Sequence, residues 1–184
     1  PWTTDPSGAV QDRARVIREV GRIRDAMAAL RALPGVDSQR IGVVGHDFGA
    51  MHAILAAAAE GEGEGEVRAL VFVAGTSRWA DWFLPFWPIE EDRLDYLRAM
   101  RDVDPIEHLP RLTDTRILLQ FARSDFFIAA MTGLELRNAA GASTQLKAYD
   151  GKHDMAMDEV RADRLTFLED ALGYGGASTA TASV

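Results

Sequence analysis

Apolar residues recur along positions 8–33 at the spacing of an α-helix. They are Val16, Val20, Ile23, Met27 and Leu30. These residues follow one another by four, three, four and three positions, which places them on one helical face. Pro34 and Gly35 then interrupt the pattern, as these residue types do after a last helical turn. The pattern predicts one long helix that packs on a sheet.

Shorter apolar runs bounded by polar or turn residues predict strands. The expected strands cover residues 40–44, 67–74, 116–122 and 144–149. Helical stretches are expected at 48–59, 129–140 and 155–172. Because helices alternate with strands, the order predicts the α/β class, with a parallel sheet flanked by helices. Residues 75–115 contain many aromatic side chains and predict an irregular, lid-like excursion.

The chain of 184 residues has room for one domain. We expect a single domain over residues 1–172, followed by a tail at 173–184 whose Gly, Ala, Ser and Thr predict disorder. Residues 60–66 alternate Glu and Gly. This alternation fixes no ligand geometry and predicts a solvated loop.

Composition excludes several classes of protein. Hydrophobic residues make up 47% of the chain and charged residues 26%, which is typical of a globular domain. The absence of cysteine excludes disulfides and thiolate metal sites. The net charge of −8 disfavours nucleic acid and anionic membranes as partners. Neither a membrane span nor a signal peptide is visible. We therefore expect a cytoplasmic protein with no metal or other cofactor.

Reactive side chains follow three of the predicted strands. Asp47 follows the first strand, Asp125 the third and His153 the fourth. Ligands of parallel sheets bind at the carboxyl ends of the strands, so we expect these three side chains to converge there. Asp81 follows the second strand and is a reserve candidate for an acid. No two histidines have metal-ligand spacing beside a carboxylate motif.

The segment from Gly45 to Gly49 has the form Gly-x-Asp-x-Gly between an apolar strand and an Ala-rich helix. A turn this tight holds its central residue in strained, left-handed backbone geometry, which Asp tolerates better than most residues. We expect the two glycines to let the strand and the helix approach without Cβ clashes. Alternatively, Asp47 satisfies only local backbone N–H groups, and Asp125 only caps a helix.

Three segments resemble a known family. Residues 37–50 resemble the nucleophile elbow of α/β-hydrolases related to dienelactone hydrolase and the acyl-peptidase-like esterases. The acid-bearing strand of that family is matched by 117–125, after Asp104-Pro105 and Leu109-Pro110, and its histidine loop by 149–153. The resemblance covers residues 8–172 and implies the α/β-hydrolase fold with a triad in the order nucleophile, acid, base.

Two departures from that family matter. The family usually has Ser at the elbow, whereas Asp47 is typical of haloalkane and fluoroacetate dehalogenases and of epoxide hydrolases. In addition, 46 residues precede Asp47 and most form one helix, so the family's early strands and oxyanion loop are not found. The resemblance thus implies a sheet without its N-terminal strands. Either a second copy of the chain or a preceding segment would complete it.

These observations predict a hydrolase of small apolar ester, epoxide or halide substrates. Asp47 is the predicted nucleophile, His153 the base and Asp125 its orienting acid. The backbone N–H of Phe48 would supply half of the oxyanion hole. The substrate-pocket candidates are His46, Trp79, Trp82, Phe83 and Trp87.

Alternative interpretations exist for these residues. The aromatic residues can equally form a hydrophobic cluster that packs the excursion down. We expect His52 to pack within its helix and His108 to lie on the surface. The alternative to an enzyme is an inert α/β-hydrolase-like domain used for binding.

Overall fold

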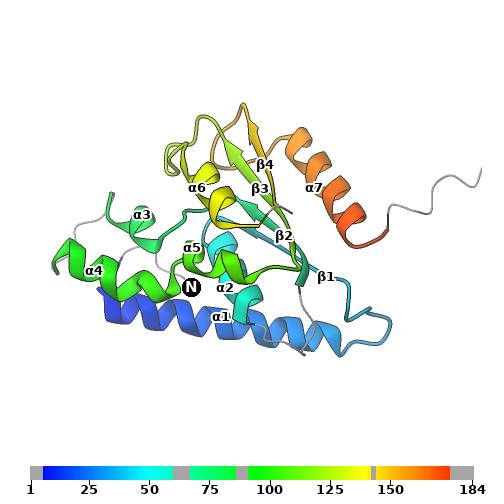
Figure 1. Cartoon of the computed structure of the whole chain (residues 1–184), viewed down its shortest axis with the longest axis horizontal. Coiled ribbons are helices and arrows are strands. Elements are labelled where there is room, and N and C mark those ends of the chain that lie inside the picture. The colour runs from blue at the N-terminus through cyan, green and yellow to red at the C-terminus, as the bar shows by residue number, and fades with distance from the viewer. Residues whose placement is uncertain (1–5, 60–66, 86–90, 142–143, 175–184) are drawn as a thin grey trace, which may run out of the picture.

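The computed structural model describes residues 6–59, 67–85, 91–141 and 144–174 (Figure 1). The helices are α1 (Ala9–Arg31), α2 (Phe48–Ala59), α3 (Trp79–Phe83), α4 (Arg93–Met100), α5 (Pro105–His108), α6 (Thr132–Ala139) and α7 (Asp158–Ala171). The strands are β1 (Ile41–His46), β2 (Val67–Val73), β3 (Arg116–Ala122) and β4 (Thr144–Tyr149). Short 3₁₀ turns follow α4 and α5, at Arg101–Val103 and Leu109–Arg111.

The four strands form one parallel sheet in the order β1-β2-β3-β4. One row of the register runs across the whole sheet, through Val44, Val71, Leu118 and Gln145. Because all strands run the same way, their carboxyl ends meet at one edge. The predicted fold class, a parallel sheet flanked by helices, is confirmed.

Alternating side chains of β2 face two hydrophobic cores. Leu70 and Phe72 point toward α1 and α2, whereas Ala69 and Val71 point toward α7 on the opposite face (Figure 1). Helix α2 is buried between α1 and the sheet, and its Ala-rich sequence suits it to this inner position. This packing fixes the start of α2, where Asp47 lies.

Several boundaries differ from the sequence predictions. Helix α6 begins at Thr132 rather than at 129, and α7 begins at Asp158 rather than at 155. In the first case the Asp125 carboxylate accepts backbone N–H groups and holds the chain in a turn. Leu30, predicted on the buried face of α1, is 41% exposed. Residues 60–66 and 175–184 of the predicted loop and tail lie outside the described residues.

The excursion over residues 75–115 is largely helical, although its sequence predicted irregular structure. It is fastened to α1, because the Tyr96 hydroxyl donates a hydrogen bond to the buried Asp12 carboxylate at 3.0 Å. Arg13 and Asp102 form a second link between the same two regions. Burial raises the pKa of Asp12. These two contacts anchor the excursion to the N-terminal part of α1.

Strand β1 has a neighbouring strand on one side only within the described part of the chain. Val44 on this strand is 45% exposed. An open edge of this kind offers backbone groups for pairing with another strand. Over the same described ranges, every helix is too short or too polar to cross a membrane.

Candidate active site

The elbow between β1 and α2 places Asp47 in left-handed backbone geometry, with φ at 57°. Its N–H donates to the carbonyl of Val73 on β2 at 2.9 Å, and its own carbonyl accepts from Ala50 N–H at 3.0 Å. A Cβ on Gly45 would lie 2.3 Å from the backbone oxygen of Gly49. Glycine at position 45 is therefore required for the strand and the helix to approach.

The second glycine of the elbow does not have the role that the sequence predicted. A Cβ on Gly49 would meet no atom within 4 Å among the described residues. The residue is exposed in the first turn of α2. The steric requirement thus falls on Gly45 alone.

His153 lies between the two carboxylates named from the sequence. Its Nδ1 is 2.9 Å from Asp125 Oδ2 and hydrogen-bonded to it. Its Nε2 is 3.5 Å from Asp47 Oδ2, which is longer than an ordinary hydrogen bond. The three predicted residues therefore come together at the carboxyl edge of the sheet, with the ring between the two acids.

Asp125 is held from several directions. Its side chain is 1% exposed. Oδ1 accepts the backbone N–H groups of Phe127 at 2.8 Å and Ile128 at 3.1 Å, while Oδ2 faces His153. These bonds fix the carboxylate and, through it, the orientation of the imidazole ring.

Asp47 has a different environment. Its side chain is 29% exposed, yet Oδ1 is buried and has no hydrogen-bond partner among the described residues. A buried carboxylate oxygen without a donor is costly. This atom is positioned to accept donors that a substrate complex or a further segment would bring.

The two carboxylates set the charge state of His153. The Asp47 carboxylate beside the ring, together with Asp125, raises the pKa of His153, whereas partial burial lowers it. The carbonyl of His153 is 2.8 Å from Nε2 of His46, which ends β1. His46 therefore supports the loop that carries His153.

Left-handed backbone outside glycine occurs at three described residues, and all three follow strands at this edge. They are Asp47 after β1, Ala74 after β2 and Met155 in the loop that carries His153. Strained residues of this kind cluster at functional sites. The strain thus marks the same edge as the side-chain chemistry.

Aromatic rings surround His153 on one side. Its ring centroid is 5.1 Å from that of Phe127 and 5.8 Å from that of Trp82. Trp82 also packs edge-on against Phe48, at 5.0 Å. The Trp82 indole N–H is buried and has no hydrogen-bond partner among the described residues. Phe127 was missed from the sequence, although it stands two positions after Asp125.

The other predicted pocket residues lie elsewhere. Trp79 is fully buried, and its indole N–H donates to the carbonyl of Val103 at 2.8 Å. Its backbone N–H donates to Asp104, whose pKa is raised to about 7 by burial. Phe83 is 1% exposed and belongs to the core. Trp87 lies outside the described residues.

The remaining candidates have structural contacts. His52 is buried in α2, with Nδ1 2.6 Å from the carbonyl of Phe48. His108 is half-buried rather than on the open surface, and its Nε2 is 2.9 Å from the carbonyl of Asp102. Asp81 pairs with Arg78 rather than with His153. Across the described ranges, no three His, Asp or Glu side chains are grouped to hold a metal ion.

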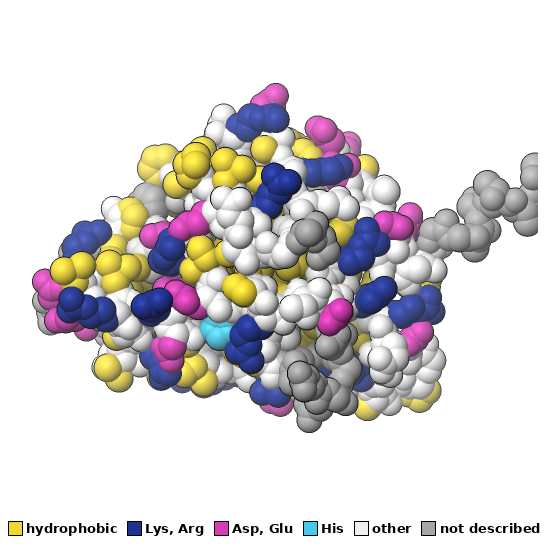
Figure 2. Space-filling view, in the orientation of Figure 1, with side chains coloured by type: hydrophobic (Ala, Val, Ile, Leu, Met, Phe, Trp, Pro, Cys, Tyr) yellow, Lys and Arg dark blue, Asp and Glu magenta, His cyan; other side chains and the backbone are white. Residues whose placement is uncertain are grey.

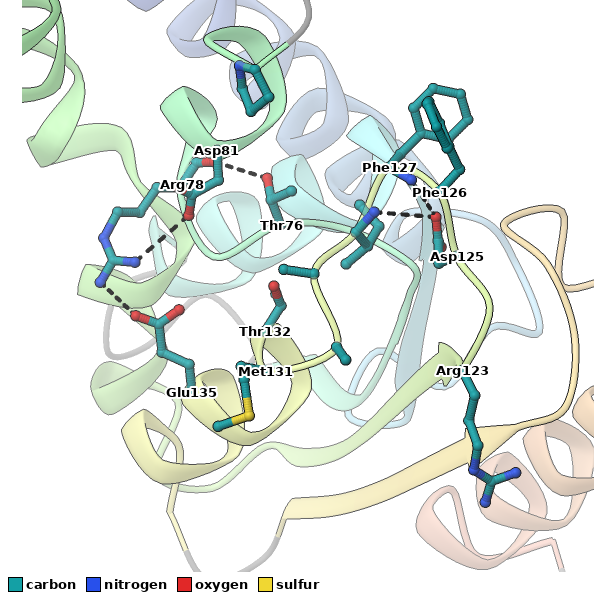
Figure 3. A pocket seen from close by; sticks show the side chains of 14 residues that line it. Thr76, Arg78, Asp81, Arg123, Asp125, Phe126, Phe127, Met131, Thr132 and Glu135 are labelled. Carbon is teal, nitrogen blue, oxygen red and sulfur yellow. Dashed lines mark hydrogen bonds and ion pairs between the residues drawn. The ribbon is translucent and has the colours of Figure 1, made fainter.

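A pocket of about 630 Å³ lies beside the loop that carries Asp125 (Figure 3). Its lining comes from the start of the excursion, the β3–α6 loop and α6, and none of the four described residues predicted for a pocket, His46, Trp79, Trp82 and Phe83, contributes to it. Asp125 and Phe127 belong both to this lining and to the surroundings of His153. The pocket therefore adjoins the surroundings of His153 through one loop.

A scan against models of protein families finds no match, and neither does a search of curated proteins. Solved structures do match. An acetyl xylan esterase from a Thermoanaerobacterium species aligns with a TM-score of 0.64 at 19% identity, over 79% of this chain and 50% of that one. Dipeptidyl peptidase 4 from Porphyromonas gingivalis aligns with a TM-score of 0.65 at 18% identity, over 85% of this chain and 22% of that one.

The α/β-hydrolase GrgF from a Penicillium species is also similar, with a TM-score of 0.65 at 14% identity, over 86% of this chain and 73% of that one. The chain thus has the fold of α/β-hydrolases, and the named neighbours are hydrolases. It spans half or less of the esterase and the peptidase.

Proposed function

We propose that the protein is a hydrolase of the α/β-hydrolase fold whose triad is Asp47, His153 and Asp125. The observation that carries this proposal is the position of His153, with Nδ1 on Asp125 and Nε2 facing Asp47. The hydrolase names of the structural neighbours support the reaction class. The substrates are small apolar esters, epoxides or halides.

The chemistry of a carboxylate nucleophile favours halides and epoxides over carboxylic esters. Attack by Asp47 on an sp³ carbon forms an alkyl ester of its side chain and either releases a halide ion or opens an epoxide ring, whose oxygen takes a proton from solvent water and becomes a hydroxyl group. Attack on a carboxylic ester would instead form a mixed anhydride, which is a poor intermediate. The unpartnered indole N–H of Trp82, close to His153, supports a role in holding the leaving anion.

The second step hydrolyses the ester of Asp47. His153 Nε2 removes a proton from water, and the resulting hydroxide attacks the ester carbonyl carbon. Asp125 stabilises the imidazolium that forms, and the alcohol product leaves with that proton. The backbone N–H of Phe48 would donate to the developing oxyanion.

The surroundings of His153 support this sequence of steps. In the free protein the charged Asp47 carboxylate contributes most to the raised pKa of His153. Alkylation makes Asp47 neutral and removes that contribution. The pKa of His153 therefore falls once the intermediate has formed, and more of the imidazole is neutral when it must accept a proton from water.

Trapping of the intermediate tests the proposal. In the whole protein, His153→Gln should still form the alkyl ester with 1-bromobutane or styrene oxide but should not hydrolyse it. Mass spectrometry should then find the adduct on the peptide that contains Asp47. His108→Gln, on a half-buried histidine whose ring contacts the carbonyl of Asp102 instead of the triad, should behave like the unmodified protein.

A substrate that the unmodified protein consumes without leaving an adduct in His153→Gln would reject Asp47 as the nucleophile. Failure to consume any ester, epoxide or halide would favour the inert binding domain. In that case the contact between His153 and Asp47 would be a structural ion pair.

The open edge of β1 also supports a proposal about assembly. We propose that its open edge pairs with another strand, from a second copy of this chain or from a preceding segment of the protein. The exposed Val44 supports this. A Val44→Lys substitution should weaken such pairing, and sedimentation of the chain with and without it measures the effect.

A further inference from the structure

The pocket beside Asp125 has two chemically different walls (Figure 3). One wall is polar and comes from Thr76, Arg78, Asp81 and Glu135. The other is the apolar β3–α6 loop, residues 126–131, and Pro85 adds to the apolar part of the lining. A ligand that fills this pocket must therefore present both a polar group and an apolar body.

The polar wall is built around one guanidinium. Arg78 lies between two carboxylates, 2.7 Å from Glu135 Oε1 and 3.6 Å from Asp81 Oδ2 (Figure 3). The three side chains are 35%, 38% and 46% exposed, in the order Arg78, Glu135, Asp81. One positive and two negative groups leave this wall with one uncompensated negative charge.

The single hydroxyl proton of Ser77 shows which of the two carboxylates, Asp81 or Glu135, has fewer hydrogen-bond donors. The Ser77 hydroxyl is 2.7 Å from Glu135 Oε2 and 3.2 Å from Asp81 Oδ2, but it has one proton to donate. The shorter contact gives that proton to Glu135, which Arg78 also pairs. Arg78 accordingly lowers the pKa of Glu135, whereas burial raises the pKa of Asp81. Asp81 retains acceptor capacity for an incoming donor.

The remaining charged groups of the lining are already neutralised. Arg123 pairs with Asp150 at 2.8 Å and points away from the pocket (Figure 3). Asp125 is committed to His153 and to two backbone N–H groups. The net charge of the pocket lining is therefore negative, and the excess negative charge lies at Asp81 and Glu135.

The apolar wall is exposed at its rim. Phe126 is 78% exposed and Met131 67% exposed. Hydrophobic side chains gather on the surface over the β3–α6 loop and α6 (Figure 2). Phe127, in the same wall, contacts the His153 ring. An apolar body held on this wall would run from the polar pocket toward the triad.

We propose that this pocket binds a protonated amine joined to an apolar body, as the part of the substrate remote from the bond that is cleaved. The ammonium group would donate to Asp81, and the apolar body would lie against Phe126, Phe127 and Met131. A carboxylate in the same place would face two carboxylates and an already paired guanidinium. That the occupant is the substrate rests on the proposed function; the preference for an amine rests on the pocket alone.

Binding to a protein that cannot react tests this directly. The whole protein with Asp47→Asn, labelled with ¹³C at the methionine methyl groups, is titrated with 4-phenylbutylamine, 4-phenylbutanol and 5-phenylpentanoate. The Met131 methyl resonance should shift, whereas that of Met27 on α1 should not. The amine should bind about three- to tenfold more tightly than the alcohol, and the acid most weakly.

Two further variants locate the preference. Asp81→Asn should remove the advantage of the amine over the alcohol, and Asp170→Asn should retain it, because Asp170 pairs with Arg116 at the opposite end of β3. Equal or tighter binding of the acid, or an unmoved Met131 resonance with the amine, would overturn the proposal. If Asp81→Asn does not fold, the relative affinities of the amine, the alcohol and the acid for the protein that retains Asp81 still test the amine preference. Adduct formation at Asp47 without amine preference would leave the proposed function intact and reject this pocket.

Discussion

The two carboxylates that flank His153 differ in almost every physical respect. Asp125 is 1% exposed, and its oxygens accept from two backbone N–H groups and face Nδ1 of the ring. Asp47 is 29% exposed, sits in left-handed backbone, and has an oxygen without a hydrogen-bond partner in the described structure. The Asp125 carboxylate is held by hydrogen-bond donors, whereas Asp47 has strained backbone and one carboxylate oxygen without a donor.

Under the proposed function, this difference separates an orienting group, Asp125, from a reactive one, Asp47. A carboxylate whose lone pairs are occupied by donors has little tendency to attack carbon, but it holds a neighbouring imidazole in one orientation. A carboxylate with a free oxygen at a strained turn retains its nucleophilicity. We therefore expect substitutions at the two loops to affect different properties.

The largest effect is expected at the acid. Asp125→Asn should slow hydrolysis of the intermediate by on the order of 10³–10⁴-fold, because the amide no longer favours the reactive tautomer and the imidazolium. Formation of the alkyl ester should change far less, since attack by Asp47 needs no base. Rapid-quench kinetics separate the two steps. Equal losses in both steps would mean that Asp125 acts through folding alone.

Substitutions of the two elbow glycines should change the free energy of unfolding by different amounts. Gly45→Ala should cost about 3 kcal/mol or more, because the new Cβ would lie 2.3 Å from a backbone oxygen. Gly49→Ala should be neutral or stabilising by up to about 1 kcal/mol, since its Cβ meets open space and Ala favours helix. Denaturant unfolding of both variants measures this difference. Similar costs at the two positions would reject the steric account.

A smaller effect is expected at Asp47 itself. With φ at 57°, Asp47→Gly should be more stable than Asp47→Ala by about 1–2 kcal/mol, because only glycine adopts left-handed backbone without a Cβ penalty. Both variants should lose activity. Equal stabilities would show that the elbow relaxes when the carboxylate is removed, and that the strain belongs to the side chain.

The final prediction is a shift in titration. Asp47→Asn mimics the neutral ester and should lower the pKa of His153, because the carboxylate that contributes most to raising it is gone. The sign follows from charge: a negative neighbour favours the imidazolium, and a neutral one does not. An NMR titration of the His153 ring protons measures it. An unchanged pKa would place the control of His153 entirely at Asp125.

The fold and the convergence of Asp47, Asp125 and His153 could be predicted from the sequence because their signals are local. A strand followed by Gly-x-Asp-x-Gly and an Ala-rich helix predicts the tight turn at Asp47, and the alternation of strands and helices places Asp125 and His153 in the loops after β3 and β4. The pocket was not accessible, because Arg78 and Glu135 are 57 positions apart and meet only through packing. Aromatic composition likewise did not distinguish Trp79, which fills the core, from Trp82, which contacts His153.

The most direct test of the central claim, that Asp47 forms a covalent ester, is a single turnover in ¹⁸O-labelled water with the whole protein. Water attacks the ester carbonyl of Asp47, so the label should enter the Asp47 side chain and the first alcohol product should contain unlabelled oxygen. Mass spectrometry of the product and of the Asp47 peptide reads both. Label in the product at the first turnover, with none in Asp47, would contradict the account.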